Sequence, residues 1–298
     1  MPIPGRDVAL GFTIPSRNAR GRVVQLGDTL DLILARHNYP PVIAKLLAEA
    51  LVLTALLGSL LKEAEGQLTV QAQSEGGVVS LLVCDYRGGE LRGYVQHDPE
   101  RLAEIGATPS LFGMFGKGYL AITFDQMVSG ERYQGIVPLE GDSLAHAAER
   151  YFAQSEQLPS MVRIAVDVQG ETGNLAGGLL MQYLPEGEEG RTRLHVEQDH
   201  PGWQAVETLA QTVSPAELID DRLPPDRLLW RLFNEEEVHI LPHVVIGRGC
   251  RCTLDYYKSV LARFPADERT HMADEHGIIQ VDCAFCAKLF PIVNADLG

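Results

Sequence analysis

The sequence is short of positive charge. It contains 25 lysines and arginines against 40 aspartates and glutamates, which gives a formal net charge of -15. This balance repels phosphate backbones and anionic lipid headgroups, so it argues against a general nucleic-acid-binding or membrane-surface protein. The remaining composition, with 45% hydrophobic and 22% charged residues, is that of an ordinary soluble protein.

Long apolar runs are also missing. The most apolar stretch, residues 50–61, is about a dozen residues long, which is too short to span a bilayer, so we expect a core helix there. Residues 1–25 contain scattered Arg and Pro and no continuous apolar segment. This pattern predicts a cytoplasmic protein without a targeting segment.

Motifs for catalysis and nucleotide binding are absent as well. Gly113, Gly116 and Gly118 around Lys117 imitate a phosphate-binding loop, but the Walker spacing and the hydroxyl residue after the lysine are lacking. No Ser/His/Asp order and no pair of carboxylates at a catalytic spacing stands out. We therefore do not expect an enzyme.

Cysteines are few, but four of the five lie in the last fifth of the chain. Cys250 and Cys252 form a Cys-x-Cys motif, and thirty residues later Cys283 and Cys286 form a Cys-x-x-Cys motif. In a cytoplasmic protein such a cluster indicates metal or redox chemistry, not a static disulfide framework. Four thiolates fill the tetrahedral shell of one zinc ion, so these four residues are the predicted metal ligands.

The two motifs are expected in different local structures. Apolar and β-branched residues at 278–281 and 289–292 predict a β-hairpin with the Cys-x-x-Cys at its tip. Thr253 predicts the N-cap of a helix through Leu261, which places the Cys-x-Cys at a helix N-terminus, where the dipole lowers thiol pKa values. On a strand, two cysteines two residues apart can share an ion or bond each other, and both possibilities stay open.

The cations and histidines near the four cysteines, and the fifth cysteine, are not expected to be metal ligands. Four thiolates around one zinc ion carry a net negative charge, which we expect to be offset by Arg248, Arg251, Lys258 and Lys288. Since the thiolates already fill the shell, we expect surface or supporting positions for His239, His243, His271 and His276. The fifth cysteine, Cys84, lies in a predicted strand and is expected to be a buried small hydrophobic residue.

The expected fold class is α+β. Residues 1–185 are predicted to form a domain of largely antiparallel sheets with packed helices, residues 186–242 an acidic helical linker, and residues 243–298 a small C-terminal zinc-binding domain. Helices are expected at 42–62 and 144–155. Strands are expected at 68–73, 78–84, 90–95, 119–124, 133–138, 162–168 and 175–183.

The acidic segment carries thirteen acidic and five basic residues between positions 186 and 237. Trp203, Val206 and Val213 recur at helical spacing, Ser214 to Glu217 forms a capping-box pattern, and a third helix would carry apolar residues around 228–233 on one side. Two interpretations remain open. The segment is either a solvated helical linker or a marginally stable element whose packing is lost on a small perturbation.

The whole chain resembles one bacterial protein family, the 33 kDa heat-shock proteins, which are redox-regulated holdase chaperones. The resemblance starts from the spacing of the two cysteine motifs and spans nearly the full length. It is also carried by residues 37–40 (HNYP), 91–94 (LRGY), 151–152 (YF), 155–159 (SEQLP), 176–180 (AGGLL) and 229–233 (LWRLF). Gly249, Thr253 and Phe290 depart from the family pattern, where an aromatic, a serine and a tyrosine are usual.

The resemblance implies an ATP-independent chaperone that is inactive when reduced and zinc-bound. On oxidation Cys250 would pair with Cys252 and Cys283 with Cys286, and zinc would leave. The partners implied are unfolded or unfolding client proteins, with a homodimer in the oxidised state and neither nucleic acid nor membrane.

Two other function classes compete with the holdase. A thiol-disulfide oxidoreductase would use the Cys-x-x-Cys, but that motif is expected to open a helix in such enzymes, and here it lies in a predicted hairpin. A structural zinc-ribbon interaction protein is the third class. Spacing alone does not separate a structural zinc site from a redox switch.

Overall fold

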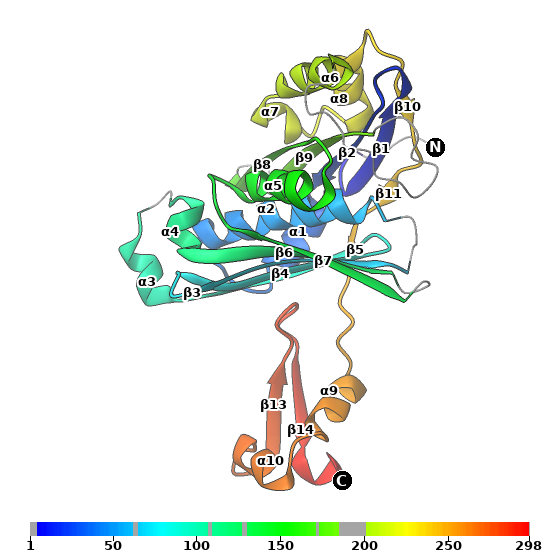
Figure 1. Cartoon of the computed structure of the whole chain (residues 1–298). Coiled ribbons are helices and arrows are strands. Elements are labelled where there is room, and N and C mark those ends of the chain that lie inside the picture. The colour runs from blue at the N-terminus through cyan, green and yellow to red at the C-terminus, as the bar shows by residue number, and fades with distance from the viewer. Residues whose placement is uncertain are drawn as a thin grey trace.

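The computed structural model describes residues 5–61, 65–106, 109–126, 130–170, 173–184 and 201–297. Figure 1 shows two six-stranded sheets in layers with helices between them, a group of helices on the outer side of the first sheet, and a small module below the second. Because the sheet pairings are almost all antiparallel, the predicted α+β class is confirmed.

The first sheet has the order β10-β1-β2-β9-β8, with β11 also paired to β1. All of its pairings are antiparallel. Its strands are β1 Val8–Ile14, β2 Ala19–Leu26, β8 Ser160–Gly170, β9 Gly173–Tyr183, β10 His239–Ile240 and β11 Val244–Val245.

The second sheet has the order β12-β5-β4-β3-β6-β7. Its strands are β3 Gln67–Glu75, β4 Val79–Arg87, β5 Glu90–His97, β6 Lys117–Gln126, β7 Glu131–Pro138 and β12 Gly247–Arg248. Side chains of β3 alternate between buried and half-buried, so the sheet has an inner face toward the helices and an outer face away from them. Gly88 and Gly89 close the β4–β5 hairpin with φ values of 55° and 90°, a backbone region that favours glycine.

Helix α2, Pro41–Gly58, forms the centre of the core between the sheets. It is the one helix among the described residues that is long and apolar enough to cross a membrane, but 78% of it is buried inside the protein. The expected core helix is therefore present. It ends four residues before the predicted end at Lys62, a residue outside the described ranges.

The other helices around this core are short. They are α1 Asp28–Leu34, α3 Pro99–Glu104, α4 Leu111–Phe115 and α5 Leu144–Tyr151, with a 3-10 turn η1 at Pro15–Arg17. The helix predicted at 144–155 is α-helical only to Tyr151 and then continues as a π-helical turn, η2 Phe152–Glu156.

All seven predicted strands are present, with ends that differ by no more than three residues. No strand or helix was predicted at the positions of β1, β2 and α1. Six of the seven residues of β1 are buried, so this strand lacks the alternation of apolar and polar residues by which strands are recognised.

The helices of the acidic segment pack on the outer side of the first sheet. They are α6 Pro201–Gln211, α7 Pro215–Leu218 and α8 Pro225–Phe233. Trp203, Leu229 and Phe233 are buried, and the ring of Phe233 lies 5.8 Å from that of Phe12 on β1. The capping box at Ser214 is confirmed. Residues 186–200 of this segment lie outside the described ranges.

The chain returns from α8 along both sheets before it reaches the cysteines. Strands β10 and β11 pair with β1, and β12 then pairs in parallel with β5. A Cβ atom at Gly249 would lie 2.5 Å from the Cβ of Glu90, which explains why this position has no side chain. The segment 239–249 therefore connects the first sheet, the second sheet and the C-terminal module.

Candidate metal centre

The C-terminal module consists of α9 Leu254–Leu261, α10 Ala266–Met272, a hairpin of β13 Ile278–Asp282 and β14 Leu289–Val293, and a final turn η3 Asn294–Leu297. The predicted hairpin is confirmed, with Asp282 opposite Leu289 at its end. The predicted N-cap is confirmed too, because the Thr253 hydroxyl accepts a hydrogen bond from the backbone N–H of Tyr256 at 3.1 Å.

The hairpin tip is a tight turn around Cys283. Its N–H donates to the Lys288 carbonyl, and its own carbonyl accepts from the N–H groups of Cys286 and Ala287 at 3.2 and 2.8 Å. Ala287 has a left-handed φ of 53°, which closes the turn. Both sulfurs of the Cys-x-x-Cys therefore face the same side of the tip.

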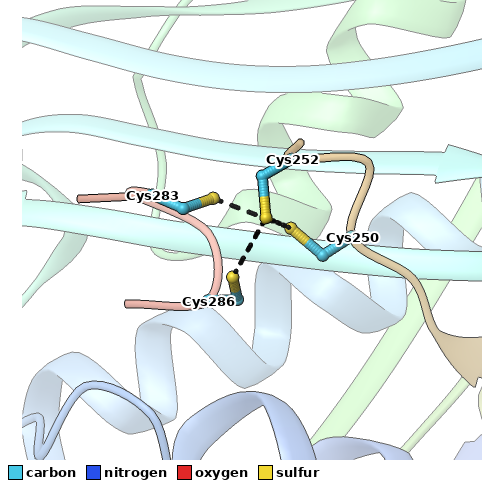
Figure 2. Close-up of side chains that lie close together, drawn as sticks. All are labelled: Cys250, Cys252, Cys283 and Cys286. Carbon is cyan, nitrogen blue, oxygen red and sulfur yellow. Dashed lines mark hydrogen bonds between the residues drawn. The ribbon is translucent and has the colours of Figure 1, made fainter. Parts of the chain in front are cut away.

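The structure brings all four predicted ligands together. Their Sγ atoms lie within 4.8 Å of one another (Figure 2). The sulfurs are 3.3 Å apart for Cys250 and Cys252, 3.6 Å for Cys250 and Cys283, and 3.5 Å for Cys252 and Cys286. All four are free thiols.

These distances fit a metal ion. Four sulfurs at about 2.3 Å from a tetrahedral zinc are about 3.8 Å apart, close to the observed spacings, whereas a disulfide requires about 2.05 Å. The cluster is therefore compatible with a metal ion held by thiolates.

The cluster lies against a small apolar core. Cys283 and Cys286 are buried, and Cys250 and Cys252 are half-buried. The other buried residues of this core are Leu261, Ile279, Phe290, Ile292 and Leu297. Such a small core makes a metal site an important part of the stability of the module.

The thiols of the cluster differ in acidity. Burial opposes ionisation of Cys283, but hydrogen bonds from the Tyr257 hydroxyl and from the Phe285 and Cys286 N–H groups outweigh it and lower its pKa to about 7. Burial raises the pKa of Cys252 and of Cys286. From the sequence we expected the helix dipole to lower the pKa of the Cys-x-Cys thiols, and this was wrong for Cys252, because burial and the neighbouring sulfurs raise its pKa.

The four cations predicted around the cluster mostly make other contacts. Arg251 donates to Gln67 on β3, Lys258 lies 4.0 Å from Asp296, and Lys288 lies 4.9 Å from the ring centroid of Phe290. Arg248 is exposed. Of the predicted set, Arg251 is hydrogen-bonded to the second sheet, and Arg248 belongs to its edge strand β12.

The remaining predicted residues lie outside the sulfur cluster. None of the four histidines belongs to it, and His239, for example, pairs with Glu237 at 3.0 Å. Cys84 is fully buried in β4, and burial raises its pKa, so the prediction of a small core residue is confirmed.

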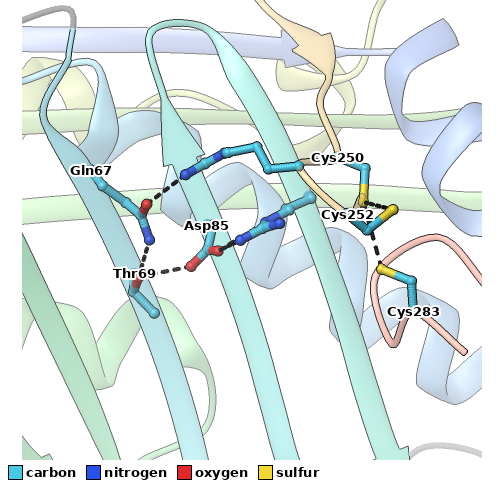
Figure 3. A network of polar contacts seen from close by, with 8 residues as sticks. Gln67, Thr69, Asp85, Cys250, Cys252 and Cys283 are labelled. Carbon is cyan, nitrogen blue, oxygen red and sulfur yellow. Dashed lines mark hydrogen bonds and ion pairs between the residues drawn. The ribbon is translucent and has the colours of Figure 1, made fainter. Parts of the chain in front are cut away.

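A polar network that the sequence did not reveal joins the module to the second sheet (Figure 3). Arg251 Nη1 donates to Gln67 Oε1 at 2.6 Å, and Gln67 donates to the Thr69 hydroxyl. Thr69 donates to Asp85 at 2.7 Å, and Arg92 pairs with the same carboxylate at 2.6 Å. The residue between the first two cysteines is thus hydrogen-bonded to the outer face of the sheet.

Comparison with known proteins agrees with this arrangement. The model of the Hsp33 protein family matches residues 7–292. The 33 kDa chaperonin of Caulobacter vibrioides is 41% identical over 96% of this chain and 94% of its own length, and that of Shigella boydii is 34% identical over 99% and 95%.

A solved structure supports the same fold. The crystal structure of the 33 kDa chaperonin from Thermotoga maritima superposes with a TM-score of 0.78 at 21% identity, over 98% of this chain and 97% of that one. With sequence relatives that cover almost the full length, the chain belongs to the Hsp33 family of 33 kDa chaperonins, which are redox-regulated holdases and not enzymes.

Proposed function

We propose that this protein is a cytoplasmic, ATP-independent holdase whose four clustered cysteines hold one zinc ion in the reduced, inactive state. Oxidation pairs Cys250 with Cys252 and Cys283 with Cys286 and activates the protein. The observation that carries the proposal is the meeting of four free thiols, from two motifs thirty residues apart, at the spacing of a tetrahedral metal site.

The redox step has a simple balance. Four thiolates lose four electrons and form two sulfur–sulfur bonds, while two molecules of a peroxide accept those electrons with four protons and are reduced to water. Hydrogen bonds within the folded module lower the pKa of Cys283 to about 7, which favours the thiolate that attacks a peroxide. No thiolate then remains to hold the metal.

Loss of the metal removes much of what folds the module. Zinc bound by a small cysteine module contributes on the order of 10 to 16 kcal/mol of folding free energy. The module follows directly on β12 and on the segment that pairs with β1, so its unfolding frees the connection to α8. The apolar faces of α6 and α8, with Trp203, Leu229 and Phe233, are then available to unfolding client proteins.

The proposed organisation follows from these roles. Residues 1–185 form the client-binding and dimerisation domain, residues 186–242 the acidic linker, and residues 243–298 the redox-switch domain. A homodimer is proposed for the oxidised protein, as the family resemblance implies.

Zinc content, free thiols and chaperone activity, measured together before and after peroxide at raised temperature, test this function. Zinc should fall from one ion per chain to none, and free thiols from five to one, since Cys84 is fully buried. Suppression of citrate synthase aggregation should rise in parallel. The proposal fails if activity appears while zinc and all thiols are retained.

A further inference from the structure

The tip of the metal-site hairpin inserts an aromatic ring into a site on the outer face of the second sheet. Phe285, the residue before Cys286, lies edge-to-face with Tyr94 of β5, with ring centroids 4.9 Å apart. The guanidinium carbon of Arg92 lies 3.9 Å from the centroid of the Phe285 ring. The Phe285 carbonyl lies 3.2 Å from His37 Nε2. We call His37, Arg92 and Tyr94 the aromatic seat.

Contacts within the second sheet, and between that sheet and the α1–α2 connection, hold the aromatic seat in place without help from the module. Arg92 forms a largely buried ion pair with Asp85. His37 stacks on Tyr39 at 4.9 Å, and the Tyr39 hydroxyl exchanges two hydrogen bonds with the backbone of Val95. The geometry of the aromatic seat should therefore persist when the module leaves.

The chemistry of the aromatic seat is selective for flat rings. A guanidinium over the ring face and a phenol at its edge both interact with the π system, so they favour an aromatic side chain over an aliphatic one. His37 adds a contact to a backbone carbonyl, which any polypeptide offers. Val83, the cross-strand neighbour of Tyr94, is half-buried on the same face and provides an apolar flank.

We infer that the aromatic seat is a binding site for aromatic side chains of unfolded clients, and that Phe285 occupies it in the reduced protein as a built-in competitor. The inference rests on the proposed holdase function and names one surface that this function uses. A competitor on the same chain acts at a high effective concentration, so it excludes clients for as long as the module stays folded.

Two residues that contact the second sheet lie between cysteines, so the occupancy of the aromatic seat by Phe285 depends on the state of the four thiols. Phe285 lies between the two cysteines of the second motif, and Arg251, which donates to Gln67, lies between the two cysteines of the first. Both contacts therefore depend on the shape of the sulfur cluster. Pairing of the cysteines and unfolding of the module would withdraw Phe285 and open the aromatic seat.

Peptide binding to the oxidised full-length protein tests the inference. Two fluorescein-labelled unstructured peptides that differ only by a central Phe or Leu are compared by fluorescence anisotropy. We expect the Phe peptide to bind about fivefold more tightly. Tyr94→Leu should bring this ratio close to one, while Tyr94→Phe should preserve it. Tyr119→Leu, the same change on the same face at β6, is the matched control and should leave the ratio unchanged. An unaltered ratio in Tyr94→Leu overturns the inference.

A second measurement uses the reduced, zinc-loaded protein. Phe285→Ala should keep its zinc, because no ligand changes, and should bind the Phe peptide where the wild-type protein does not. Leu289→Ala, at an exposed position of the same hairpin, is the control and should behave as wild type. The inference is wrong if Phe285→Ala keeps its zinc and still excludes the peptide. If this variant loses zinc, the Tyr94 series decides by itself.

The two proposals fail in different ways. If oxidised wild-type protein releases no zinc and suppresses no aggregation, the proposed function is wrong. If it does both, but Phe and Leu peptides bind equally well, only the aromatic seat is wrong.

Discussion

Removing the metal from the fully reduced protein with a chelator is expected to unfold the C-terminal module while both six-stranded sheets stay folded. The five apolar side chains buried in the module contribute roughly 1.5 to 3 kcal/mol each, or about 8 to 15 kcal/mol together. A zinc site contributes a similar amount, on the order of 10 to 16 kcal/mol. Chelation therefore removes about half of the favourable terms that balance the chain entropy of the module.

Hydrogen exchange followed by mass spectrometry measures the unfolding of the C-terminal module directly. Peptides from residues 250–297 should lose nearly all amide protection when zinc is removed in the presence of a reductant. Peptides from α2 should keep theirs, because that helix is buried between the two sheets. The same comparison shows whether 239–249, which pairs with both sheets, loosens along with the module.

One outcome would refute this reasoning. If zinc is lost stoichiometrically and residues 250–297 remain protected, the apolar core of the module is sufficient on its own, and the thiolate cluster does not control folding. Cys84→Ala serves as the control, since Cys84 lies in β4 outside the cluster, and this variant should lose protection at the same chelator concentration as the wild type.

Three further predictions follow from contacts elsewhere. Phe233→Ala should destabilise α8 on the first sheet by about 3 to 5 kcal/mol and shorten the peroxide treatment needed for aggregation suppression. Gly249→Phe should collide with Glu90, weaken the β12–β5 pairing and speed amide exchange at residues 247–249, with zinc retained. Burial lowers the pKa of His37 from its ordinary 6.5, so the part of the folding free energy that depends on neutral His37 is complete above about pH 6.5 and is lost as the pH falls through the lowered pKa. Thermal denaturation at pH 7.5 and 5 should show this loss, and His37→Gln should reduce the pH dependence.

The docking of the hairpin tip gives a role to segments that the sequence singled out without one. Residues 37–40 and 91–94 were two of the segments that carried the family resemblance. The structure brings them together around Phe285, although they lie more than fifty residues apart in the chain. Residues 37–40 and 91–94 come together because of the strand pairing in the second sheet and the position of the α1–α2 connection. Neither feature has a local sequence signal.

Features with a local cause were predictable from the sequence. The hairpin at 278–293 follows from apolar residues on both sides of a tight turn, and the start of α9 follows from the Thr253 hydroxyl. The capping box at Ser214 and the core helix α2 are of the same kind. Each depends on residues a few positions apart, so the sequence pattern carries the physical interaction directly.

By itself, the sequence determined the four thiols as one metal site, the hairpin and the helix start that present them, and the acidic helices with one apolar face. Only the tertiary structure decided the distances between the sulfurs, the lowered pKa of Cys283, and the contacts of Phe285 and Arg251 with the second sheet. These properties depend on burial and on contacts between distant segments. Long-range packing sets both, and no short stretch of sequence encodes them.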